Sequence, residues 1–139
     1  MPPDLLALLT RFPQLLAAHL ENLPEETLDT NEGPNTWTIR EVVAHLADLE
    51  AHAWLPRIQF ILQHGPTQPL PAIHREAFRD QKTTNPLEVF TTQRTQNLAK
   101  LKLTESDLHR QGLHPALGIV TISQLLATWA THDLTHLSQ

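Results

Sequence analysis

The residues best suited to do chemistry are two histidines near the end of the sequence, His132 and His136. In a helix, a spacing of four positions brings both side chains to one face. A helical wheel of about 100° per residue places both on the arc that also holds Ile122 and Trp129. Imidazoles on a buried face need polar partners, and one divalent metal ion can serve both rings. The pair therefore indicates a metal site, although His-x-x-x-His is by itself a common pattern.

A catalytic metal site of this kind has three protein ligands and one open coordination position, so a third histidine is needed. The predicted second helix offers His45 and His52, both on the shoulder of its apolar stripe. The wheel does not choose between them. Four further histidines fall in connecting segments and are expected to be solvated: His64, His74, His109 and His114.

Three charged residues fall on predicted apolar faces: Glu50, Asp133 and Arg94. Each carboxylate could orient a ligand imidazole through its second ring nitrogen, or could pair with the guanidinium of Arg94. Both roles stay open for both carboxylates. An inward guanidinium needs a carboxylate or reaches out to water. Arg94 is also a candidate contact for an anionic group of a substrate.

Four amphipathic helices must position these residues. They are predicted at residues 3–22, 39–63 and 86–101, and from 122 to at least 136. Two of them begin at capping-box patterns, formed by Thr38 with Glu41 and by Thr121 with Gln124. Pro13 should kink or interrupt the first helix, and Pro56 should bend or break the second.

Long connections separate the four helices, at residues 23–37, 64–84 and 102–120. They are rich in Pro, Gly and polar residues, with short helical pieces expected near 74–78 and 105–110. We expect no strand, because no alternation of useful length is present. Residues 1–139 thus predict a single all-α domain, a four-helix bundle whose long connections permit a crossover.

The composition narrows the classes of function. The 139 residues contain 40% apolar and 18% charged residues, which is ordinary for a soluble protein with a real core. The formal charge of −5 and the scattered basic residues argue against a nucleic-acid partner. No apolar run reaches membrane-spanning length and no signal-peptide pattern opens the sequence, so we expect a cytoplasmic protein. With no cysteine, any thiol chemistry must use a thiol from the substrate.

Two blocks of the sequence resemble the DinB/YfiT-like superfamily of proposed metalloenzymes. They are WTIREVVAHLADLE at 37–50 and VTISQLLATWATHDLTH at 120–136, and the resemblance extends over nearly the whole chain. It implies a four-helix bundle in up-down-down-up order. It also implies a metal site formed by His45, His132 and His136. Members of this superfamily continue beyond the second histidine of the pair, whereas this sequence ends at Gln139, so His136 is expected in a fraying last turn.

Known activities in the superfamily include thiol S-transferases that use bacillithiol or mycothiol, and a mycothiol-dependent isomerase. The resemblance therefore implies a metal-dependent thiol S-transferase or hydrolase with a zinc or nickel ion and a small-molecule substrate. Two other hypotheses stay open. One is a non-catalytic bundle that a metal stabilises and that serves as a binding or dimerisation module, with a homodimer as its assembly. The other is a metal-free cluster of structural histidines.

Overall fold

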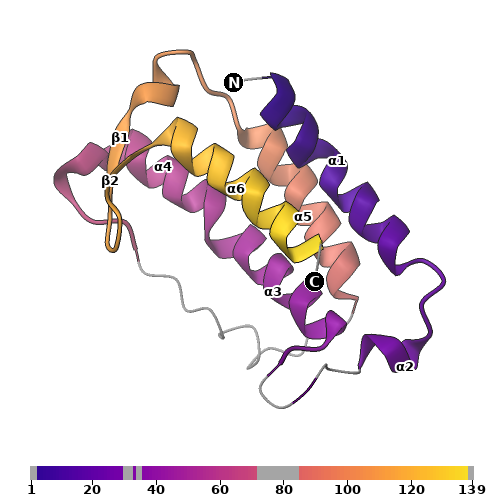
Figure 1. Cartoon of the computed structure of the whole chain (residues 1–139). Helices are drawn as coiled ribbons and strands as arrows, with labels where there is room; N and C mark the ends of the chain where they lie inside the picture. The colour runs from indigo at the N-terminus through magenta and orange to yellow at the C-terminus, as the bar shows by residue number, and fades with distance from the viewer. Residues whose placement is uncertain (1–2, 30–32, 34–35, 72–84, 138–139) are drawn as a thin grey trace.

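Four long helical segments pack side by side in the computed structural model, which describes residues 3–29, 33, 36–71 and 85–137 (Figure 1). They are α1 (Pro3–Leu20), α3 with α4 (Ile39–His52 and Trp54–His64), α5 (Pro86–Lys100) and α6 (Ile122–Leu137). Figure 1 shows α1 and α6 running in one direction and α3–α4 and α5 in the other. This is the expected four-helix bundle in up-down-down-up order. A short α2 (Glu25–Leu28) follows α1.

The two helices that carry the candidate metal ligands, α3 and α6, begin at the predicted capping boxes. The Thr38 hydroxyl accepts the Glu41 N–H at 3.1 Å, and the Glu41 carboxylate accepts the Thr38 N–H at 3.0 Å. Thr121 and Gln124 form the same reciprocal pair, at 3.1 and 2.8 Å. Each box satisfies two backbone donors at a helix start, which fixes where α3 and α6 begin and hence which residues face inward.

The two internal prolines have different effects. Pro56 lies in the first turn of α4, directly after the break at Ala53 that separates α3 from α4, so the predicted break is confirmed. Pro13 does not interrupt α1, so of the two expected effects the interruption is wrong, while a kink stays a prediction. Proline lacks the N–H that would bond the carbonyl four residues earlier. That carbonyl belongs to Leu9, and the Arg94 side chain donates to it at 2.8 Å.

A small β-hairpin lies between α5 and α6, where the sequence indicated no strand. Strands β1 (Gln111–His114) and β2 (Gly118–Thr121) pair antiparallel. Four residues are too few to show a clear alternation, and the turn depends on Gly118, whose φ of +78° suits glycine. The helical piece expected at 105–110 is the 3₁₀ turn η3 (Asp107–His109). The one expected near 74–78 lies outside the described residues.

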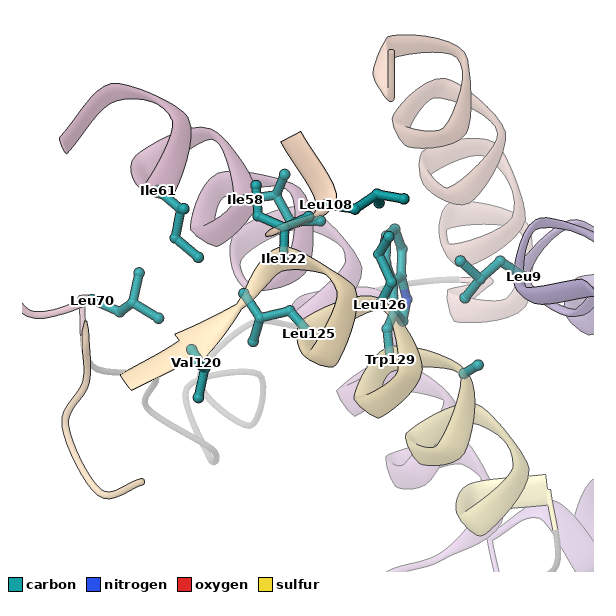
Figure 2. Close-up of a cluster of buried hydrophobic side chains, with 11 residues drawn as sticks. Leu9, Ile58, Ile61, Leu70, Leu108, Val120, Ile122, Leu125, Leu126 and Trp129 are labelled. Atoms are coloured by element: carbon teal, nitrogen blue, oxygen red, sulfur yellow. The ribbon is translucent and has the colours of Figure 1, made fainter. Parts of the chain in front are cut away.

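Two apolar clusters fill the bundle. The larger joins α1, α4 and α6 through Leu9, Ile58, Ile61, Leu126 and Trp129, together with hairpin and loop residues (Figure 2). The smaller joins α1, α3 and α5 through Phe12, Leu16, Leu46, Ala47 and Phe90. The stripe of α6 that the wheel predicted is therefore the core face. None of the helices that the structure describes is both long and apolar enough to cross a membrane.

Candidate metal centre

Three histidines from two helices come together inside the bundle. His45 comes from α3, and His132 and His136 come from α6. One imidazole nitrogen from each lies within 4.8 Å of the other two. His45 is 1% exposed, while the pair on α6 is half-buried. The ring centroid of His45 is 6.0 Å from that of His132 and 5.4 Å from that of His136.

The donor set fits a divalent transition metal. The Nε2 atoms of His132 and His136 are 3.0 Å apart. Two nitrogens bound to one tetrahedral zinc ion at the usual bond length are about 3.4 Å apart, so the pair already has nearly the required spacing. Neutral imidazole suits zinc, nickel, copper and iron. Three such ligands match the number in catalytic sites, where a fourth position is open.

His52, the other candidate from the same helix, is exposed to solvent. Its side chain is 67% exposed and its Nε2 lies 3.8 Å from the Asp48 carboxylate. Nearly two turns of α3 thus separate a buried imidazole from a solvated one. The expected solvation of the connecting histidines fits His109, which is exposed, but not His64, which is half-buried at the end of α4. His114 is half-buried in the hairpin turn, where its Nδ1 accepts two backbone N–H groups, and His74 lies outside the described residues.

Two tryptophans flank the histidines. The Trp37 ring centroid lies 4.8 Å from that of His45, and the Trp54 centroid lies 5.4 Å from that of His132. Trp54 also stacks on Trp129 at 5.8 Å, with an interplanar angle of 8°. Trp37 and Trp54 are half-buried. Sequence reasoning did not assign these two tryptophans to the site, because no spacing rule connects them to histidines on other elements.

Arg94 is buried, and all three nitrogens of its guanidinium group donate hydrogen bonds within the protein. Its Nη1 and Nη2 donate to the two oxygens of Asp133, each at 2.9 Å, and its Nε donates to Glu50 at 2.9 Å. Of the roles left open for the two carboxylates, the structure shows the pairing with Arg94. The guanidinium is 1% exposed, so the expectation that it meets an anionic substrate group does not fit the structure.

Asn97 completes the buried polar cluster. Its amide nitrogen donates to the Glu50 carboxylate at 2.8 Å and to the Glu50 backbone carbonyl at 2.7 Å. Burial raises the pKa of Glu50 and raises that of Asp133 to about 6, in both cases against the opposing effect of Arg94. Sequence reasoning missed Asn97. Its only signal was its place one helical turn after Arg94, on the same face of α5.

Known proteins with similar sequences or structures point the same way. A protein of Oceanobacillus iheyensis named "Putative metal-dependent hydrolase" is 27% identical over 133 residues, which cover 91% of this chain and 76% of the relative. The structure of YfiT from Bacillus subtilis, described as "a probable metal-dependent hydrolase with an unusual four-helix bundle topology", matches with a TM-score of 0.82. The match has 25% identity and covers 97% of this chain and 81% of YfiT. Residues 8–139 match the family described as the DinB superfamily, and the chain therefore belongs to that superfamily.

Proposed function

We propose that this protein is a metal-dependent enzyme that acts on a small molecule, with the ion held by His45, His132 and His136. The observation that carries the proposal is the meeting of three imidazole nitrogens from α3 and α6 within 4.8 Å. Both similar proteins are described as metal-dependent hydrolases, which supports the same reading. The ligand set suits zinc and nickel alike.

A zinc or nickel ion held by these histidines would supply Lewis acidity, which would lower the pKa of a bound water or thiol. The chain's own residues prepare the site. His45 is held in the core between helices, so its ring is fixed in place. Trp37 and Trp54 give the histidines apolar neighbours that exclude water and can contact an apolar part of a substrate.

Two reactions use such a site with different nucleophiles. In hydrolysis water attacks the substrate, and the names of the similar proteins favour this reaction. In thiol S-transfer, a thiolate sulfur attacks an electrophilic carbon, and the leaving group departs with its electron pair. The superfamily resemblance supports this second reaction. Because the chain has no cysteine, the thiol must be a small molecule such as bacillithiol or mycothiol.

The first test is metal content. We would prepare protein without an affinity tag, strip it, reload it with zinc or nickel, remove excess ion and measure bound metal. Wild type should hold about one equivalent, and His45→Ala and His132→Ala should hold less than about one-tenth. His52→Ala is the matched control on the same helix and should bind like wild type, because its side chain is 67% exposed. Unchanged binding by both alanine variants of the site would contradict the proposal.

The second test is turnover by the metal-loaded protein. A panel of ester and amide substrates reports hydrolysis, and a low-molecular-weight thiol with a soluble electrophile reports S-transfer. Activity in either assay that His132→Ala loses and His52→Ala keeps would identify the reaction. Full metal loading without turnover, together with a metal-dependent dimer in sedimentation, would instead favour the non-catalytic bundle.

A further inference from the structure

We infer that Arg94 is a positioning residue of the metal centre, because it ties together α3 and α6, the two helices that carry the proposed ligands. The inference rests on the proposed metal function. It adds a residue that sets the geometry of the site and that comes from α5, a helix without a histidine. Arg94 donates to Glu50 of α3 and to Asp133 of α6 at 2.9 Å each.

The tie is close to the ligands along both helices. Asp133 directly follows His132 on α6, and Glu50 lies five residues, less than one and a half turns, after His45 on α3. The guanidinium is a rigid planar fork, so the two carboxylates that it binds have a fixed separation. That separation in turn limits how far α3 and α6 can slide or rotate relative to each other.

The guanidinium itself is held in place. Its carbon lies 5.0 Å from the ring centroids of both Phe90 and Trp129, and 5.7 Å from that of Phe12. A further bond runs to the Leu9 carbonyl at 2.8 Å, the acceptor that Pro13 leaves without a helical donor. Arg94, on α5, is therefore hydrogen-bonded to α1, α3 and α6. Of the helices around the site, it leaves out α4.

Apolar packing alone would specify this geometry less well. Hydrophobic contacts are non-directional, and volume-conserving changes in a core are tolerated with modest shifts. A metal site needs its ligands held to within about half an ångström, which calls for locked rotamers and directional bonds behind them. The Arg94 cluster supplies such bonds between the two helices that must cooperate.

The direct test is zinc affinity of Arg94→Lys, which keeps the positive charge but loses the fork. The control is Arg11→Lys on the exposed face of α1. Dissociation constants would be measured by competition with a chromophoric chelator, and folding by urea titration of the metal-free proteins. We expect Arg94→Lys to bind zinc at least about tenfold more weakly and Arg11→Lys to stay within about twofold. A folded Arg94→Lys variant with wild-type affinity would overturn the inference.

A triple variant separates positioning from stability. Apolar residues can often replace a buried ionic cluster without loss of folding, so Arg94→Met/Glu50→Leu/Asp133→Leu should fold cooperatively. We expect it to have lost zinc affinity by at least the same factor. Wild-type affinity in the folded triple variant would overturn the inference, as would failure of both variants to fold, since the cluster would then serve the fold itself. If wild type binds neither zinc nor nickel, the proposed function is contradicted independently of Arg94.

Discussion

Replacement of Arg94 should show how much of the free energy of unfolding depends on this one guanidinium in the buried polar cluster. In Arg94→Met, Glu50 and Asp133 lose the cation that both now contact at 2.9 Å, and the Leu9 carbonyl loses its donor. Breaking a buried ion pair by removal of one partner costs about 3–5 kcal/mol. The free energy of unfolding of metal-free protein at pH 7.5 should fall by about that amount, out of a typical total of about 5–15 kcal/mol.

The loss should shrink as the pH falls. Burial already raises the pKa of both carboxyl groups, and Arg94 opposes the rise at both, with help from Asn97 at Glu50. Without Arg94, both pKa values should rise further, so the folded variant takes up protons more readily than the unfolded chain. An acid whose pKa is raised in the folded state adds stability below its unfolded pKa and loses that stability as the pH rises through the folded value. The deficit should therefore be smaller at pH 5 than at pH 7.5.

Urea titrations of wild type and variant at the two pH values, followed by circular dichroism, measure both effects. Arg11→Met, at an exposed position on α1, is the control and should change stability by less than about 0.5 kcal/mol. The reasoning is refuted if Arg94→Met loses less than about 1 kcal/mol at pH 7.5, or if its deficit grows as the pH falls.

Three further predictions concern stability of the metal-free protein. Burial raises the pKa of Asp133 from 3.8 to about 6, which should cost ~3 kcal/mol of folding stability above pH 6. Asp133→Asn should therefore remove part of the stability loss that urea titrations of wild type show between pH 4 and 7. An unchanged dependence of stability on pH would count against this prediction. Gly112→Ala would place its Cβ 2.5 Å from Ile61 Cγ1, and thermal unfolding should show a loss of about 1–3 kcal/mol; a neutral result would mean that Ile61 moves freely. Thr121→Ala should cost about 1 kcal/mol in urea titration through the lost cap of α6, and no loss would show the capping bonds to be dispensable.

Local patterns in the sequence were enough for the helices and their starts. A capping box is completed within four residues, so both boxes and the first inward residues of α3 and α6 could be predicted. The prediction of no strand failed because the hairpin strands have four residues each. The effect of Pro13 could not be foreseen, because the donor that replaces its missing N–H comes from Arg94, on another helix.

The candidate site, too, could be predicted only as far as local patterns reach, because its contacts join different helices. A wheel gives the direction of a side chain but not its partner, so His45 and His52 could not be told apart from periodicity alone. The superfamily resemblance favoured His45, and the fold brings its ring on α3 close to that of His132 on α6. Likewise the inward position of Arg94 was predictable, whereas its simultaneous contact with Glu50 and Asp133 depends on how three helices meet.

The most direct test of the central claim is an anomalous difference map from a crystal of tag-free protein soaked in zinc, recorded at the zinc absorption edge. We expect a single strong peak within about 2.0–2.1 Å of an imidazole nitrogen of each of His45, His132 and His136. An empty site at full zinc loading, or an ion bound elsewhere, for example between His52 and Asp48, would contradict it.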